Sequence, residues 1–192
     1  MRYFLFVILT VLTSNCVKDS QIMYQRNPEW ELADKIYDGE IGKKVFCQLK
    51  KEKKLQVCES GWGLRGKKKI QVMHCGFFYF DEIDIAQARE LLLAAGNLYL
   101  ATINENERMR PFLENYPFTL ENIEICIFLQ NRDGSKLSPE KLCILSFTKG
   151  ILRYEIGALD SKGYLTEICE EKYDEAMQKI TTSSTRQSKD IL

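Results

Sequence analysis

The sequence predicts an α+β protein with an N-terminal hairpin and strand, a long central helix, an antiparallel meander of about four strands and a C-terminal helix. Three observations lead to this class. Apolar residues recur at helical spacing from Ile85 to Tyr99, they alternate strictly from Ile123 to Leu129, and turn-forming residues then occur at short intervals. With 192 residues, of which 45% are hydrophobic, the chain is long enough to bury one core.

The first residues have the order of a bacterial secretory signal. Met1 and Arg2 give a positive start, residues 3–13 form an apolar run, and the polar residues Ser14 and Asn15 come next. The run is too short to span a bilayer comfortably, which favours a cleaved signal over a membrane helix. We therefore predict that residues 1–15 are a signal peptide and that the protein is exported. The alternative is a buried N-terminal strand or helix.

Cys16 lies directly after this signal, and its position resembles the lipidated cysteine of bacterial lipoproteins. Such signals usually carry leucine three residues before the cysteine and a small residue just before it. This chain has Thr13 and Asn15 at those places, with Leu12 one position early. Two outcomes stay open: Cys16 is lipidated and anchors the protein to a membrane without spanning it, or the cleaved protein is soluble.

The composition divides the remaining chain into three parts. Residues 16–40 are polar and weakly patterned, and we predict a tether or a loosely docked arm. Residues 41–180 carry the regular apolar patterns and are predicted to form one α+β domain. Residues 181–192 are polar again, and we predict a disordered tail.

The domain is predicted to begin with a hairpin of two strands, 43–50 and 53–59, followed by a strand at 70–80. The first strand of the hairpin is inferred from the alternation of Val45, Cys47 and Leu49 with polar residues. The central helix is expected to begin at Asp84, because Gln87 three residues later completes the pattern of a capping box.

The second half is predicted to be the meander, with a helix over 170–180 after strands at 121–130, 142–148, 151–159 and 164–169. The first two of these strands are apolar on the face opposite Ile123 and Ile125 as well, through Cys126, Phe128, Cys143, Leu145 and Phe147. A sheet with one wet face would show polar residues there. We therefore predict that a protein partner or a second copy of the chain covers this apolar face.

The net charge is zero, with 27 basic and 27 acidic residues, which argues against a dedicated nucleic-acid-binding protein. The charges are unevenly placed, because residues 43–69 hold ten basic residues and only two acidic ones. We predict a surface there that binds lipid headgroups, polysaccharide or an acidic partner, formed by Lys50, Lys51, Lys53, Lys54, Arg65, Lys67, Lys68 and Lys69. The alternative is a solvated hairpin edge that lysine protects from aggregation.

The sequence offers little material for catalysis. One histidine and the lack of any Cys-x-x-Cys spacing leave no recognisable zinc or thioredoxin-like site, so no catalytic residue, metal or cofactor is predicted. Residues 61–66 match Gly-x-Gly-x-x-Gly but lead into a strand rather than a helix, which favours a connecting loop. His74 and Cys75 are neighbours on a predicted strand, so their side chains should point to opposite faces.

A series of local motifs extends over roughly residues 75–180, and it includes Phe80–Leu92, Ile103-Asn104, Arg110–Leu113, Asn115–Thr119 and Asn122–Ile125. This series resembles a group of uncharacterised exported proteins from Chlamydia-like intracellular bacteria. The resemblance implies a setting at the bacterial envelope. It implies no activity and no catalytic residues.

Together these features predict a non-enzymatic exported protein that works by binding at the bacterial cell envelope, in the periplasm or attached through Cys16. Two other hypotheses stay open. One is a cysteine-dependent hydrolase or redox protein that uses Cys47, Cys58 or Cys75 near His74. The other is a secreted effector that binds an anionic surface through the basic hairpin.

Overall fold

The computed structural model describes residues 28–64 and 69–189. The chain divides into two compact units, Met1–Leu32 and Ala33–Leu192, and the sheet belongs to the second unit. The helices and strands of this second unit, with the helix that enters it, are α2 (Pro28–Ile36), the π-helix η1 (Tyr37–Gly42), α3 (Lys43–Lys53), β1 (Gln56–Gly63), β2 (Val72–Tyr79), α4 (Ile85–Glu105), η2 (Arg110–Phe112), η3 (Leu120–Asn122), β3 (Ile123–Leu129), β4 (Leu142–Thr148), β5 (Ile151–Leu159), β6 (Leu165–Lys172) and α5 (Tyr173–Lys189).

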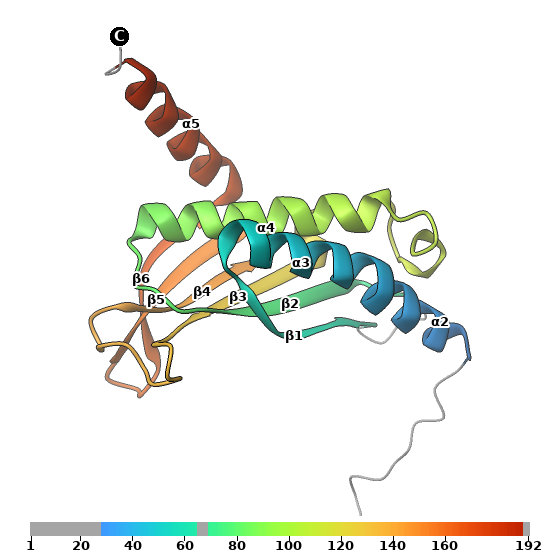
Figure 1. The fold of residues 1–192 in the computed structure, drawn as a ribbon, viewed down its shortest axis with the longest axis horizontal. Helices are drawn as coiled ribbons and strands as arrows, with labels where there is room; N and C mark the ends of the chain where they lie inside the picture. Colours follow the sequence, from blue (N-terminus) through green and yellow to red (C-terminus); the bar gives the residue numbers. More distant parts are fainter. Residues whose placement is uncertain (1–27, 65–68, 190–192) are drawn as a thin grey trace, which may run out of the picture. The chain divides into compact units, whose positions relative to one another are not determined.

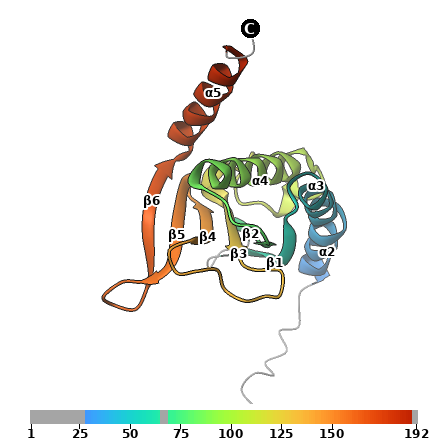
Figure 2. The same ribbon diagram turned by 60° about the vertical axis from the view of Figure 1, so that its left-hand side comes forward.

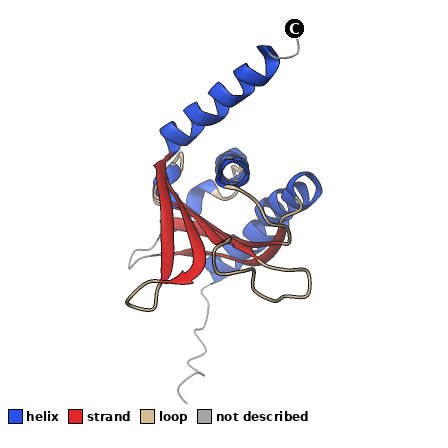
Figure 3. Ribbon diagram, turned by 90° about the vertical axis from the view of Figure 1, so that its left-hand side faces the viewer, coloured by secondary structure: helices blue, strands red, loops and turns tan. Residues whose placement is uncertain are grey.

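The strands form one six-stranded sheet in the order β1-β2-β3-β4-β5-β6. Every neighbouring pair is antiparallel except β2 and β3, which are parallel and are connected by the long helix α4. The α+β class, the central helix and the C-terminal helix are therefore confirmed, whereas the strand count differs from the predicted meander of about four. Helices α3 and α4 lie on one face of the sheet (Figures 1 and 3).

The predicted hairpin of residues 43–59 is wrong, because residues 43–53 form α3 and only the part from Gln56 onward is a strand. The physical reason is a coincidence of spacing. Val45 and Leu49 are four residues apart, which suits one face of a strand and one face of a helix equally well. Ile41, which is also fully buried, extends the same helical row by one turn.

Both ends of the described chain are more regular than the composition predicts. Helix α2 and the first part of η1 lie inside the segment, 16–40, predicted to be a tether, and Ala33, Ile36 and Tyr37 are buried in the core. At the other end, α5 runs through Lys189 and so includes most of the segment predicted to be a disordered tail. Its first residue is fixed on the domain, because the Tyr173 ring stacks on Phe147 and its hydroxyl donates a 2.8 Å hydrogen bond to Asn97.

The apolar side chains of β4 do not form a second apolar face. Phe147 lies opposite Ile125 and Leu145 opposite Ile127, so all four point toward the helices and are buried. A register shift between Leu142 and Ile144 in the pairing of β4 with β5 changes the alternation along this strand. The predicted pairing of Leu145 and Phe147 with Cys126 and Phe128 on one face is therefore wrong.

Helix α4 provides the main contact between the helical layer and the sheet. It begins as predicted, with the Asp84 side chain accepting a hydrogen bond from the Gln87 backbone and Gln87 accepting one from Asp84 in return. Leu92, Ala95, Tyr99 and Ile103 along this helix are fully buried. Gly96 brings the helix close to the sheet, because a Cβ atom at this position would lie only 2.6 Å from the ring of Phe147.

A buried pair of tyrosines joins the helices to the middle of β2. The hydroxyl groups of Tyr37, in η1, and Tyr99, in α4, lie 2.8 Å apart and share a hydrogen bond in which either can be the donor, and they lie 3.0 and 3.3 Å from the backbone carbonyl of His74, to which the other hydroxyl donates. Burial raises the pKa of both phenols, so they stay protonated and able to donate. Three elements from separate parts of the sequence thus meet at one carbonyl oxygen.

We expect Gly96→Ala to destabilise the protein by about 1–3 kcal/mol, because the added methyl group would overpack the contact with Phe147 and outweigh the gain in helix propensity. The measurement is urea unfolding. Gly39→Ala is the matched control, since no atom lies within 4 Å of the position its methyl group would take. A Gly96→Ala protein as stable as the wild type would show that α4 can move away from the sheet at little cost.

Candidate functional site

The strongest candidate for a functional surface is the outer side of α3. The inner side of this helix is fixed by Val45 and Leu49, which are buried, and by Phe46, whose ring meets Phe77 of β2 edge-on at 5.9 Å. With the apolar row turned to the sheet, the remaining residues point to solvent. The residues of α3 therefore form an apolar side that packs on the sheet and a polar side that faces solvent.

We call the outward residues of this segment the lysine face: Lys43, Lys44, Lys50, Lys51, Lys53 and Lys54. All are exposed except Lys53, which is half-buried, and Cys47 is exposed among them. Residues 43–54 contain a single acidic residue, Glu52, so the segment carries a net charge of +5. Lys44 is paired with Glu105 of α4 at 2.7 Å, and both side chains are well exposed.

The lysine face has a structural benefit as well as a possible use in binding. Lys50, Lys51 and Lys53 occupy the last turn of α3, where the helix dipole favours positive charge. Lys54 ends the helix in a left-handed conformation, with φ of 59°, and its backbone N–H donates to the carbonyl of Leu49. These effects account for cations in the last turn. They do not bear on Lys43 and Lys44, because α3 continues without a break from η1 and these two lysines lie inside a longer run of helix, away from its N-terminus.

The structure separates the residues that the sequence placed in one anion-binding surface. Lys50, Lys51, Lys53 and Lys54 precede β1, whereas Lys69 comes after it and lies at the other end of that strand. The Lys69 ammonium group donates to the backbone carbonyl of Pro111. Arg65, Lys67 and Lys68 lie outside the described residues, as does the predicted lipidation site Cys16.

The opposite face of the sheet, which α3 and α4 do not cover, differs in charge from the lysine face. By strand register it carries His74, Phe78, Cys126, Phe128 and Ile144, all half-buried. The same register places two basic residues on this face, Arg153 and Lys172. It also places five glutamates there: Glu59, Glu124, Glu155, Glu167 and Glu170. The predicted apolar face is therefore a mixed one, with aromatic and acidic parts.

His74 and Cys75 point to opposite faces, as predicted. The His74 ring lies across Gly61 of β1 on the uncovered face, where a Cβ on Gly61 would come within 2.9 Å of it. Cys75 points into the core and is 2% exposed. Burial raises the pKa of the Cys75 thiol well above its usual range, so it stays protonated at neutral pH.

The other described cysteines form no disulfide. Burial, with a contribution from Glu59, raises the pKa of Cys126 to about 12 and also raises the pKa of Cys58. Burial likewise raises the pKa values of Cys143 and Cys169. A nucleophilic cysteine needs the reverse, a lowered pKa next to a base or a cation. The geometry at these four thiols and at Cys75 therefore disfavours the cysteine-dependent enzyme.

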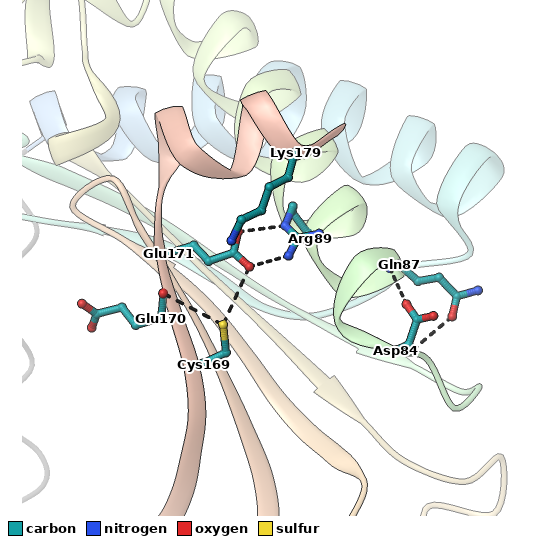
Figure 4. Close-up of polar contacts among 7 residues, drawn as sticks. All are labelled: Asp84, Gln87, Arg89, Cys169, Glu170, Glu171 and Lys179. Atoms are coloured by element: carbon teal, nitrogen blue, oxygen red, sulfur yellow. Dashed lines mark hydrogen bonds and ion pairs between the residues drawn. The ribbon is translucent and has the colours of Figure 1, made fainter. Parts of the chain in front are cut away.

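A buried ion cluster joins β6 to both α4 and α5 (Figure 4). The Glu171 side chain is 1% exposed and accepts two hydrogen bonds from Arg89, at 2.5 and 2.8 Å, while Lys179 lies 3.2 Å from it. These partners, Arg89 first, lower the pKa of Glu171 despite its burial. The hydroxyl of Tyr154 is fully buried beside the pair and has no well-formed hydrogen bond among the described residues.

Sequence reasoning missed this cluster, because its members lie far apart and only the tertiary fold brings them together. Arg89 belongs to the polar side of a helix, and the sequence pattern places Glu171 in the predicted C-terminal helix over 170–180. One signal in the sequence could have indicated burial of Glu171. This residue lies two positions after Cys169, so on a continuing strand the two side chains would share a face. The cluster acts as a structural connection between β6, α4 and α5.

No other part of the described structure gathers catalytic or metal-binding groups. The residues described include no group of histidine, cysteine, aspartate and glutamate suited to hold a metal ion. A shallow pocket of about 360 Å³ opens beside the turn between β4 and β5. Its lining includes two acidic and two basic residues, so it has no net charge that would select a ligand. These residues are Glu121, Lys149, Lys172 and Asp174.

Comparisons of the chain with protein-family models, with curated proteins and with solved structures found no match. Within residues 28–64 and 69–189, none of the helices combines the length and the apolar character that a membrane crossing requires.

We expect Glu171→Gln to destabilise the protein by about 3 kcal/mol at pH 7, because it breaks a buried ion pair. Since the folded protein lowers the pKa of Glu171, the stabilisation it provides is complete above the unfolded value near 4.5 and is lost as the pH falls through the lower folded value. The difference between wild type and variant should therefore shrink below about pH 4.5. Urea unfolding at several pH values measures it.

The matched control is Glu170→Gln, which removes the exposed neighbour that contacts Arg153 at 2.9 Å and should cost less than about 1 kcal/mol. A Glu171→Gln difference that stays constant down to pH 2, or a cost equal to that of the control, would contradict the role assigned to the buried pair.

Proposed function

We propose that this chain is a non-enzymatic, exported binding protein of the bacterial cell envelope, and that the lysine face of α3 is the part that contacts an anionic surface. The observation that carries the proposal is the orientation of α3, which turns nearly all of its lysines to solvent in a chain with no net charge. The secretory pattern of residues 1–15 and the lipoprotein-like position of Cys16 support an envelope location.

The binding free energy that the lysine face can supply suits an anionic membrane surface. Each lysine near such a surface contributes about 1 kcal/mol, and the effect falls off within a Debye length. A few lysines are too weak to hold a protein permanently but strong enough to orient one that is already attached. A protein with a lipid on Cys16 would already be held at the membrane, and the lysine face would then orient it on the anionic surface.

The cysteine-dependent alternative has less support. It needs a thiolate near His74, but the neighbouring thiol, Cys75, points into the core, and burial raises its pKa. Cys47 lies on the lysine face of α3, while His74 lies on the uncovered face of the sheet. We therefore favour binding over covalent catalysis.

We expect the full chain to bind vesicles that contain phosphatidylglycerol more strongly than neutral phosphatidylcholine vesicles. Replacing Lys43, Lys50, Lys51 and Lys54 by glutamine should reduce that preference by about 100-fold or more, from about 1 kcal/mol for each lysine removed. Vesicle co-sedimentation at low and high salt measures the preference, and high salt should suppress it in the wild type.

The control variant replaces four exposed lysines away from α3, Lys136, Lys149, Lys162 and Lys172, and so changes the net charge by the same amount. It should keep the preference for anionic vesicles. Equal losses in the two variants would show that net charge, rather than the lysine face, is responsible, and binding that is insensitive to both would refute the proposal.

We expect the lipid attachment to depend on Cys16. In a bacterial host fed a labelled fatty acid, the wild type should become labelled and Cys16→Ala should not. Cys47→Ala, which removes an exposed cysteine elsewhere, should keep the label. Label in Cys16→Ala, or no label in any of the three proteins, would remove the lipid anchor from the proposal and leave the vesicle result unaffected.

A further inference from the structure

We propose that the outer edge of β6 binds an extended, basic peptide segment of a partner protein, which pairs with β6 as a seventh strand. This inference concerns the edge of the sheet and is independent of the lysine face. It commits to a partner with alternating basic and apolar residues in extended form.

The strand β6 occupies one end of the sheet order and pairs only with β5 among the described strands. Figure 2 shows β6 as the outermost strand, with the β5–β6 turn reaching beyond the rest of the sheet. An edge strand presents backbone N–H and C=O groups that another strand can use, and this is the basis of peptide recognition by strand addition.

Exposed apolar side chains gather at the same edge. Leu159 is 65% exposed, Tyr164 is 69% exposed, and Ile168 in β6 is 45% exposed. Leu159 and the first residue of β6 are paired across the β5–β6 turn, and Tyr164 immediately precedes that residue. Leu159 and Tyr164 therefore lie at the turn and Ile168 lies further along β6, where an added strand would cover apolar surface.

The charge on this edge selects a basic occupant. Glu170 lies opposite Arg153 and Glu167 opposite Glu155, so three carboxylates face one guanidinium group. Arg153 lies 2.9 Å from Glu170 and 3.5 Å from Glu167 and is shared between them. Lysine or arginine side chains on an added strand would lie beside this row of carboxylates, and opposite charges on neighbouring strands are favourable.

A second copy of the chain suits this edge less well. The strand β6 has three glutamates, Glu167, Glu170 and Glu171, and only one basic residue, Lys172. Antiparallel pairing with its own copy would bring glutamates of the two chains together, which is unfavourable. The pairing of β6 with β5 shifts by one residue at Ile168, and this bulge limits the length of continuous pairing for a peptide and for a second copy alike.

The other edge of the sheet lacks this combination. The strand β1 also has a bulge, at Cys58, but Val57 is its only exposed large apolar residue. The β6 edge is also held firmly in place, because Glu171 is bound from the inner side by Arg89. A fixed template reduces the entropy cost of adding a strand.

The test uses the full chain and three short synthetic peptides. One alternates lysine and valine, one alternates glutamate and valine, and one is the lysine–valine peptide with every backbone nitrogen methylated, so that it keeps its charge but has no backbone N–H to donate along either edge. Titration calorimetry measures affinity, and amide hydrogen exchange locates the site. We expect the lysine–valine peptide to bind and to slow exchange in β6, and the other two to bind at least about tenfold more weakly.

Glu167→Gln combined with Glu170→Gln should weaken binding of the lysine–valine peptide by about tenfold, since two favourable cross-strand charge pairs are lost. The matched control is Glu90→Gln combined with Glu107→Gln, which makes the same change of charge at exposed positions outside the sheet and should leave the affinity unchanged. Urea unfolding of both variants confirms that they are folded.

Four results would overturn the inference. They are no binding of the lysine–valine peptide, equal binding of its methylated form, protection that appears in β1 or α3 instead of β6, and protection of β6 by concentration-dependent dimerisation without peptide. The last result would identify a second copy as the occupant. None of these results depends on vesicle binding, so the two proposals succeed or fail separately.

Discussion

The rest of the structure depends on the close packing of α4 against the sheet. This helix connects the only parallel pair of strands among those described, β2 and β3, and therefore has to run back along the sheet over its full length. The missing side chain of Gly96 lets it approach Phe147, and the Tyr37–Tyr99 pair fixes it to β2. With α4 in place, one face of the sheet is covered. The lysines of α3 and the glutamates on the uncovered face of the sheet then face solvent.

Features of the fold that depend on neighbours in sequence could be predicted. The capping box of Asp84 and Gln87 involves residues three apart, and the alternation of β3 persists without interruption. The assignment of α3 failed because a spacing of four residues satisfies a helix and a strand equally, and only packing against Phe77 distinguishes them. The facing of β4 failed because both of its sides are apolar, so its own alternation does not choose between them, and the register that places Phe147 opposite Ile125 is set by the pairing with β3.

The candidate sites divide in the same way. Lysine enrichment is a property of a segment and was visible, although the sequence combined residues from both ends of β1 into one surface. The Arg89–Glu171 pair and the β6 edge join positions that are far apart in the chain, and no local pattern marks them. The opposite faces of His74 and Cys75 could be predicted, because adjacent residues of a regular strand always diverge.

The Ile168 bulge has a geometric consequence for any strand that lies against β6. The register between β5 and β6 changes by one residue at this position, so the backbone groups on its two sides are out of phase with each other. A regular strand can follow one side or the other, but it cannot follow both. The bulge therefore sets the maximum length of regular pairing along β6. A partner strand can pair over only a few residues, and the long uniform strands that build open-ended fibrils cannot form here.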